Sequence, residues 1–344
     1  MNINVKINRC GIAAKKTRRR RQITMKFTST GLRVGAAAIG MTALFGLSHA
    51  AHATNIQVGD FVTPPAGVNV FLAYNDFTTS NTYSPTSGSD ITHGTRLQTD
   101  VPILRYVHEF QPIDGIPFGV QVIQPIVAFT GNQELGGGGL THQGGVGDTI
   151  LSAFTWLISK PLEVQYLNFT YFLTVPTGSY NHNYALNAGN NRFENDLQVD
   201  YTQALFGNAK TVHMNIELTG DAYIYGNNND MLVATAFGAQ KATLKTNNTY
   251  QIQAWLPYVF SPATAGYVAI GVSKTFGGKG TVYIPAFGAS ADTGGRTDET
   301  QLRIAAGSFV SPTLFLSAEL ARDVEVKGGF KTAAFFEIRA AKFF

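Results

Sequence analysis

The chain ends in Phe330-Lys-Thr-Ala-Ala-Phe-Phe-Glu-Ile-Arg-Ala-Ala-Lys-Phe-Phe344, and its side chains alternate between two kinds. The apolar or small set is Phe330, Thr332, Ala334, Phe336, Ile338, Ala340 and Phe344, and the other set carries Lys331, Glu337 and Arg339. A period of two predicts a β-strand with one apolar and one polar face. A last strand of this kind that stops on phenylalanine is typical of bacterial outer-membrane β-barrels. Phe336, Ile338 and Phe344 would then form the signal for assembly into that membrane.

The N-terminal region has the organisation of a secretory signal peptide. An apolar stretch over residues 34–47 follows a basic region and precedes Ala51-His-Ala53, a small-x-small cleavage site. The basic region is over-long, so we expect the true start at Met25. Its arginine run, residues 18–21, has a rival interpretation as a nucleic-acid-binding arm, but cleavage would remove it. The run lacks the apolar residues expected after a twin-arginine signal, which favours ordinary Sec export.

Removal of residues 1–53 changes the composition of the chain. These residues hold ten of the 26 Lys and Arg and none of the Asp and Glu, so residues 54–344 carry a net charge of −6. We therefore expect no nucleic-acid partner. The single cysteine, Cys10, is also removed, which leaves no thiol for disulfides, metal sites or catalysis. The apolar runs of the remaining 291 residues are too short for a membrane helix, so a membrane would be crossed by strands.

Long alternating segments predict an all-β fold. Residues 212–224 place Val212, Met214 and Ile216 on one face and polar residues on the other, and the same period returns in 164–175, 301–310 and 314–323. These segments have the length that a tilted strand needs to cross a bilayer. We predict an antiparallel up-and-down transmembrane β-barrel over residues 54–344.

The connections alternate between short turns and long polar loops, as expected of periplasmic turns and outer loops. A chain that begins and ends in the periplasm needs an even number of strands. Counting residues 280–287 as a strand gives 13, so we assign 276–299 to an outer loop with a hairpin extension, which leaves 12 strands. Fourteen strands are the alternative, with residues 231–243 supplying the extra one. We also expect Trp156, Tyr258 and Phe260 on the outward face near the periplasmic interface, although ordinary sheet packing would place aromatic residues there too.

Charged residues on the predicted inward faces are the functional candidates. They are His213, Glu217, Asp221, Arg303, Glu319, Asp323, Glu337 and Arg339. In a lumen of 12-strand width, carboxylates and guanidinium groups would meet, narrow the aperture and orient polar solutes. The alternative is that they are structural ion pairs and a plug that satisfy the polar interior of the barrel.

No motif indicates an enzyme. The glycine-rich residues 144–148 resemble a phosphate-binding loop, but no Gly-Lys-Ser/Thr follows. The histidines are scattered and predict no metal site. Ser317 and Glu319 share a face, yet it is the lumen face and no nucleophile elbow surrounds them. We therefore expect no catalytic activity and no cofactor.

Two short motifs accompany the terminal strand: Gly145-Val-Gly-Asp-Thr149 opens one predicted strand, and Pro176-Thr-Gly178 closes the next. With the terminal strand, they resemble the phenol-degradation (MetA-pathway) outer-membrane family over about residues 65–344. Lys342 departs from the apolar residue that the family carries two positions before the terminal Phe. The motifs are short and specify barrel corners more than chemistry.

The resemblance implies a porin-like transporter in the outer membrane of a Gram-negative bacterium, for passive uptake of small, aromatic or hydrophobic compounds. Two further classes stay open: a structural or surface-interaction barrel that acts through long loops such as 79–95 and 179–192, and an enzyme that modifies outer-membrane lipids. The expected partners are outer-membrane lipids and lipopolysaccharide, the barrel-assembly machinery and a small-molecule solute.

Overall fold

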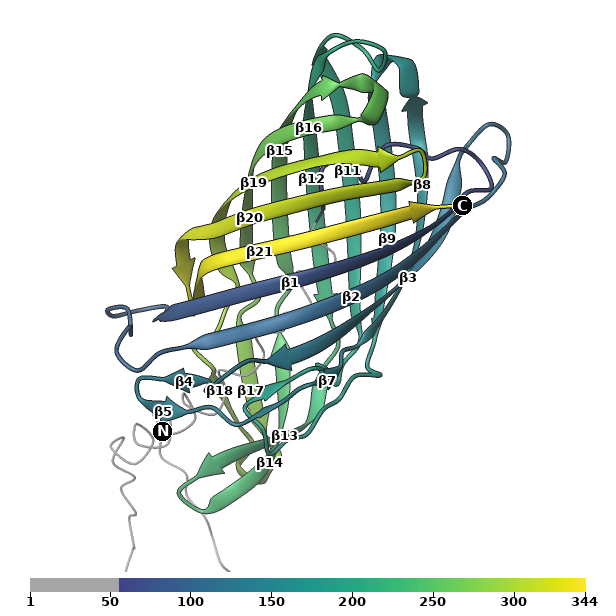
Figure 1. Ribbon diagram of the computed structural model, residues 1–344. Coiled ribbons are helices and arrows are strands. Elements are labelled where there is room, and N and C mark those ends of the chain that lie inside the picture. The colour runs from purple at the N-terminus through teal and green to yellow at the C-terminus, as the bar shows by residue number, and fades with distance from the viewer. Residues whose placement is uncertain (1–55) are drawn as a thin grey trace, which may run out of the picture.

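Twelve long antiparallel strands close into a barrel in the computed structural model, which describes residues 56–344 (Figure 1). The first strand pairs with both the second and the last, which closes the sheet. The prediction of a 12-stranded all-β barrel is therefore confirmed. The predicted signal peptide, with Met25, Ala51 and Ala53, lies outside the described residues.

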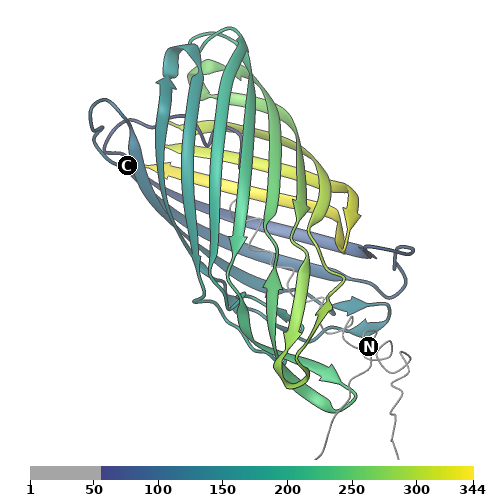
Figure 2. The same cartoon turned by 180° about the vertical axis from the view of Figure 1, so that it is seen from behind.

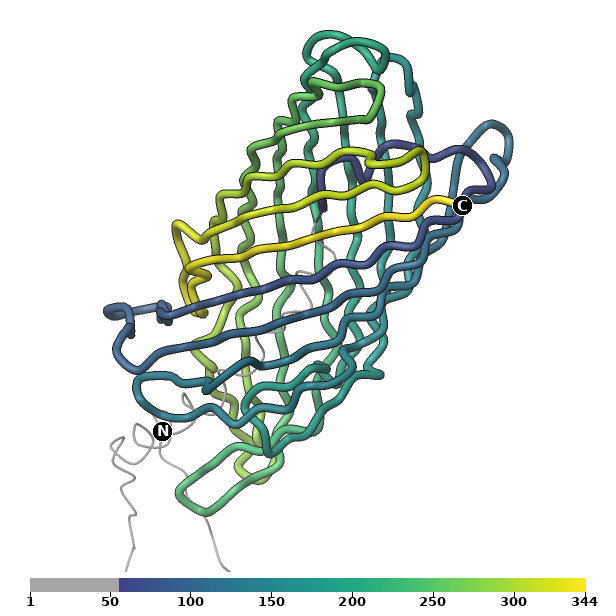
Figure 3. The backbone as a smooth tube through the Cα atoms, in the orientation of Figure 1, coloured from purple at the N-terminus to yellow at the C-terminus, as the bar shows by residue number. Residues whose placement is uncertain are grey.

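The twelve strands follow one another around the barrel in chain order, as the backbone trace of Figure 3 shows. They are β1 (Asn69–Ser84), β2 (Leu97–Glu109), β3 (Phe118–Phe129), β8 (Thr149–Lys160), β9 (Gln165–Val175), β11 (Glu194–Phe206), β12 (His213–Tyr225), β15 (Thr249–Ser261), β16 (Gly266–Gly277), β19 (Asp298–Ser311), β20 (Leu314–Lys327) and β21 (Gly329–Phe343). Five two-residue strands lie in the connections: β4 (Glu134–Leu135), β5 (Gly138–Gly139), β6 (His142–Gln143), β7 (Gly145–Val146) and β10 (Leu186–Asn187). No helix among residues 56–344 is long and apolar enough to cross a membrane.

The alternation read from the sequence decides which side chains face out. In β12, Leu218 and Ile224 are exposed on the outer face, while Glu217 and Asp221 are buried inside. The same division holds along β21, where Ile338 is half exposed and its neighbours Glu337 and Arg339 are buried. A barrel wall whose outer face is apolar is the arrangement expected in lipid.

Short turns gather at one end of the barrel and long loops at the other, as predicted. At the short-turn end, two single-turn 3-10 helices, η3 (Pro161–Glu163) and η4 (Pro262–Thr264), begin with proline. At the long-loop end, β13 (Asn228–Thr235), β14 (Gly238–Thr246), β17 (Gly280–Ile284) and β18 (Ala289–Asp292) form a separate four-stranded sheet (Figure 2). This sheet extends the barrel beyond its wall and contains the hairpin expected within residues 276–299. The 14-strand alternative is wrong because residues 231–243 belong to this extension.

Three details of the sequence prediction are wrong. Trp156 is 3% exposed and faces the lumen in phase with Phe154, whereas Tyr258 and Phe260 are exposed on the outer face. Thr332 is also turned inward, because an irregularity between β1 and β21 shifts the register there and reverses the alternation. The loop expected at 79–95 is shorter, since β1 continues to Ser84.

The two motifs of the sequence meet at the long-loop end. Asp148 accepts hydrogen bonds from the backbone N–H of Gly178, at 2.8 Å, and of Asn190, at 2.7 Å. A Cβ at Gly178 would lie 2.7 Å from the Asp148 nitrogen, so only glycine fits. The motifs therefore join the start of β8, the end of β9 and the loop that follows into one rigid corner.

Candidate functional site: the plugged lumen

Residues 56–65, here called the plug segment, lie inside the barrel rather than beyond its end. Trp255 on β15 donates its indole N–H to the carbonyl oxygen of Ile56 at 3.3 Å, and Trp156 on β8 donates to that of Phe61 at 2.9 Å. Both tryptophans face inward from separate parts of the wall, so the segment between them crosses the lumen. Sequence reasoning raised a plug only as an alternative, and did not identify this segment because it has no periodic pattern.

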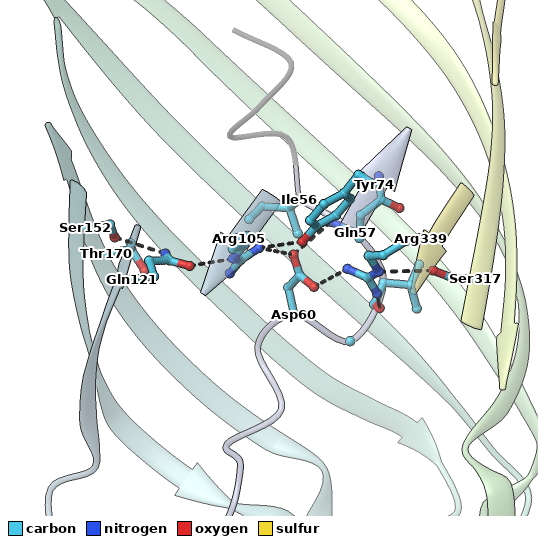
Figure 4. Close-up of polar contacts among 12 residues, drawn as sticks. Ile56, Gln57, Asp60, Tyr74, Arg105, Gln121, Ser152, Thr170, Ser317 and Arg339 are labelled. Atoms are coloured by element: carbon cyan, nitrogen blue, oxygen red, sulfur yellow. Dashed lines mark hydrogen bonds and ion pairs between the residues drawn. The ribbon is translucent and has the colours of Figure 1, made fainter. Parts of the chain in front are cut away.

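Asp60 fixes the plug segment between two arginines (Figure 4). Its carboxylate accepts a hydrogen bond from Nη1 of Arg339 at 2.5 Å and forms an ion pair with Nη1 of Arg105 at 3.4 Å. Arg105 also donates to Tyr74 at 3.0 Å and to Gln121 at 2.6 Å, which holds its guanidinium in place. We call Asp60, Arg105 and Arg339 the latch.

The latch keeps Asp60 ionised. Burial by itself would raise the pKa of this carboxyl, but the charges of Arg339 and Arg105 and the hydrogen bond from Arg339 outweigh it, so the pKa lies below the ordinary 3.8. Asp60 therefore carries its negative charge at neutral pH, and both of its ion pairs, with Arg105 and with Arg339, are formed.

A second cluster holds the start of the plug segment. Arg303 binds Glu319 through two hydrogen bonds, at 2.6 and 3.0 Å, and its guanidinium lies 4.6 Å from the ring centre of Trp255. Its remaining donors reach Gln253 at 2.5 Å and the carbonyl oxygen of Ile56 at 3.2 Å. The bidentate geometry, the two further hydrogen bonds and the stacked ring compensate for the burial of the guanidinium.

The structure places all eight predicted residues on the inward face, each at most 6% exposed: His213, Glu217, Asp221, Arg303, Glu319, Asp323, Glu337 and Arg339. Among these eight residues, Arg303 and Glu319 lie together as an ion pair. Arg339 forms its ion pair with Asp60 of the plug segment instead of with a carboxylate of the wall.

The remaining predicted residues make separate contacts. Glu217 accepts a hydrogen bond from the Gly59 N–H at 3.2 Å, and Glu337 accepts one from the side chain of Gln57 at 3.2 Å. Asp323 accepts from Gln301 and the Thr332 N–H, Asp221 from Gln198, and Nδ1 of His213 lies 2.8 Å from the Thr211 carbonyl oxygen. Two of the wall carboxylates therefore hold the plug segment directly.

An acidic stripe on β11 was missed by the sequence analysis. Glu194, Asp196 and Asp200 face inward, next to Asp221 on β12, and Asp196 is 2% exposed with no hydrogen-bond partner for either carboxylate oxygen among the described residues. These inward residues alternate with outward residues such as Leu197 and Val199, and this alternation is visible in the sequence. Within residues 56–344, no group of three or more His, Cys, Asp or Glu side chains is arranged to hold a metal ion.

The opposite wall of the lumen carries most of the buried apolar side chains, together with polar ones such as Asp76, Arg105 and Asn168. Inward-facing residues of β1, β2, β3, β8 and β9 form one buried cluster that includes Leu72, Val101, Ile103, Ile123, Val127, Ile150, Phe154 and Phe172. Porin lumens are ordinarily polar, so this wall is unusual. A cavity of about 580 Å³ lies beside the plug segment, and it is lined by Leu72, Val107 and Ile123 as well as by the three residues of the latch. The lumen thus has one wall that is rich in apolar side chains and one that is mainly polar and charged, which together hold the latch.

Comparison with known proteins identifies the family. The model of the family described as "Putative MetA-pathway of phenol degradation" matches residues 79–340. The chain belongs to this family. No curated protein matches the chain.

A solved structure supports the same assignment. The chain is 27% identical to the COG4313 outer membrane channel from Pseudomonas putida F1, with a TM-score of 0.71, and the match covers 84% of this chain and 100% of that one. The β domain of the Bordetella autotransporter BrkA (8% identity, TM-score 0.43, 80% and 99% coverage) and a mutant of the TodX monoaromatic hydrocarbon channel (9%, 0.46, 81% and 90%) are more distant. The protein is an outer-membrane β-barrel channel, and its short-turn end is the periplasmic end.

Proposed function

We propose that the protein admits small, largely apolar solutes, aromatic compounds included, across the outer membrane without an energy source. The apolar wall of the lumen carries this proposal. Apolar side chains inside a lumen offer a polar solute no hydrogen-bond partner, whereas an apolar solute that lies against them loses contact with water. The family description, which names phenol degradation, supports this class of solute, and the similarity to the COG4313 outer membrane channel supports a channel.

A pair of variants on one strand tests the proposal. Ile103 faces the lumen and is 4% exposed, while the next residue, Leu104, faces lipid. We expect Ile103→Thr to slow the entry of 1-N-phenylnaphthylamine, a neutral aromatic fluorophore, into outer-membrane vesicles. The expected factor is roughly tenfold, because a lost apolar contact in a pocket is worth about 1–3 kcal/mol.

The matched control is Leu104→Thr, which makes the same polar change on the other face and should leave the entry rate near that of the wild type. Equal rates with wild-type protein and with vesicles that lack it would refute the proposed function. Unchanged transport by Ile103→Thr would refute the role of the apolar wall.

We also propose that the chain is no enzyme. Both groups that could have formed a catalytic pair are engaged elsewhere: the Ser317 hydroxyl accepts a hydrogen bond from Nε of Arg339 at 3.1 Å, and Glu319 is bound by Arg303. A lipid or lipopolysaccharide modification that disappears in Ser317→Ala would refute this.

For biogenesis, we propose Sec export followed by insertion through the barrel-assembly machinery into lipid and lipopolysaccharide. The leader pattern of residues 34–53 and the outward Phe336 and Ile338 support this route. Accumulation of the uncleaved precursor on inhibition of the Sec translocase tests it, and normal processing under that inhibition would contradict it.

A further inference from the structure

The apolar outer face of the barrel ends in cations on one side only. On β20, the exposed Leu320 is followed on the outer face by the exposed Arg322, toward the long-loop end. On β16, Val272 is followed in the same way by the half-exposed Lys274. The six consecutive strands of the other side, β3, β8, β9, β11, β12 and β15, contain a single Lys or Arg, and this residue, Lys160, lies at the periplasmic end. The cationic outer edge therefore belongs to one half of the wall.

A register irregularity adds a third cation to this edge. The shift between β1 and β21 turns Thr332 inward, so the preceding residue, Lys331, faces outward. With unbroken alternation, Lys331 would share the inward face of Glu337. Irregularities of this kind re-aim side chains. Nζ of Lys331 donates to the carbonyl oxygen of Val324 at 3.0 Å, and Val324 lies where the register between β19 and β20 also shifts. The two irregularities thus place Lys331 against β20, the neighbouring strand that carries Arg322 (Figure 1).

Arg322 and Lys331 are the cations of this edge that no carboxylate neutralises. Lys274 lies 3.0 Å from Asp298 and 3.7 Å from Glu325, and these two carboxylates also pair with the other cations of the outer loops. Within residues 56–344, neither Arg322 nor Lys331 takes part in an ion pair. An unpaired cation facing hydrocarbon is costly. At the level of the lipid headgroups, the same cation is attracted to phosphate.

The position of Arg322 along its strand corresponds to the headgroup level. It lies eight residues after Leu314, with which β20 begins at a periplasmic turn. At about 3.3 Å per residue and a tilt of about 40°, this length spans roughly 20 Å across the membrane, within an apolar band about 25 Å tall. The long arginine side chain can carry its charge further outward. The guanidinium therefore reaches the outer edge of the hydrocarbon.

An apolar surface lies directly below the two cations. Leu320 and Phe336 are cross-strand partners of β20 and β21 on the outer face. Phe336 also stacks on Phe77 of β1, with the ring centres 6.2 Å apart. Acyl chains can pack against these side chains while their headgroup meets the cations.

We propose that Arg322 and Lys331 form a binding site for a phosphate group of lipopolysaccharide, the phosphorylated lipid of the outer leaflet. The planar guanidinium of arginine offers two parallel donors to phosphate oxygens, and the lysine ammonium adds a compact charge beside it. The site lies at the outer end of the wall, so phospholipids of the inner leaflet do not reach it. The inference concerns the outer face and does not depend on which solute passes through the lumen.

A pair of charge-neutralising variants tests the site. Native mass spectrometry of the purified barrel in detergent measures the binding of diphosphoryl lipid A. Arg322→Gln with Lys331→Gln should bind it roughly thirtyfold more weakly than the wild type, because each cation near a charged lipid surface contributes about fivefold. Lys160→Gln with Lys210→Gln is the matched control, since it removes the same charge from exposed residues at periplasmic turns and should bind as the wild type does.

The lipid itself supplies the second control. Lipid A from which both phosphates have been removed keeps its acyl chains, and it should bind weakly and equally to all the proteins. Equal binding of lipid A by the wild type and the Arg322→Gln, Lys331→Gln variant would overturn the site. Equal binding of the two forms of lipid A by the wild type would overturn the recognition of phosphate. Phosphatidylglycerol bound as tightly as lipid A would overturn the assignment to lipopolysaccharide.

A single substitution guards against a folding defect of the double variant. Arg322→Gln alone should weaken the binding of lipid A roughly fivefold, and heat-modifiable migration in gels checks that the barrel has formed. A folded Arg322→Gln barrel with wild-type affinity for lipid A would count against the site.

Discussion

Asp60→Asn should open the path along the axis of the barrel, which the plug segment obstructs. The side chain of Asp60 is 10% exposed and that of Arg339 is 4% exposed, so the ion pair between them is largely removed from water. Removal of one partner from a buried pair costs about 3–5 kcal/mol, because the other charge stays buried without compensation. Asparagine keeps a hydrogen-bond acceptor, so we take the lower end. A loss of about 3 kcal/mol shifts the balance between seated and displaced plug segment roughly 100-fold.

Single-channel recording in planar bilayers measures this shift as the fraction of time in a high-conductance state. Asp114→Asn is the matched control, because Asp114 lies exposed in the short turn between β2 and β3 and is in none of the ion pairs of the described residues. Heat-modifiable migration in gels checks that each variant still forms a barrel. An Asp60→Asn barrel that is intact and keeps the conductance pattern of the wild type would refute the role of the latch.

The same latch predicts the direction of a pH effect. The pKa of Asp60 is lower with the plug segment seated than its ordinary 3.8 with the segment displaced. The stabilisation is therefore fully present above about pH 4 and is lost as pH falls through the lowered value. Wild-type conductance should rise in strongly acidic solution, and Asp60→Asn should lack this rise.

Three further predictions concern stability. Asp196→Asn should leave the stability of the barrel in urea unfolding unchanged or raise it, because burial without a hydrogen-bond partner costs a carboxyl group that can ionise more than it costs a neutral amide; the exposed loop variant Asp90→Asn is the control, and a clear loss of stability in Asp196→Asn alone would contradict the argument. Gly271→Ala should destabilise the barrel by about 1–3 kcal/mol in urea unfolding, because its Cβ would lie 2.4 Å from the ring of Trp255. Gly220→Ala, where nothing lies within 4 Å, is its control, and equal stability of the two variants would contradict the packing argument. Asp148→Ala should expose the loop over residues 179–192 to protease, because the amides of Gly178 and Asn190 lose an acceptor at about 1–3 kcal/mol; cleavage as slow as in the wild type would show that the corner holds without it.

The sequence by itself determined the fold, the strand number and the face of most side chains. A strand places successive residues on opposite sides whatever surrounds it, so alternation alone put Glu337 inside and Ile338 outside. The lengths of the connections can also be read directly from the sequence. Together with the need for an even number of strands, they predicted 12 strands. The errors at Trp156 and Thr332 arose where the predicted phase or register did not hold.

Only the tertiary structure decided which of the inward charges meet. Arg339 pairs with Asp60, 279 positions earlier in the chain, because barrel closure brings the last strand beside the plug segment. That segment has no period from which its place could be inferred. Contacts across a lumen depend on the register and closure of all twelve strands at once, whereas the inward or outward face of a residue depends on its own strand.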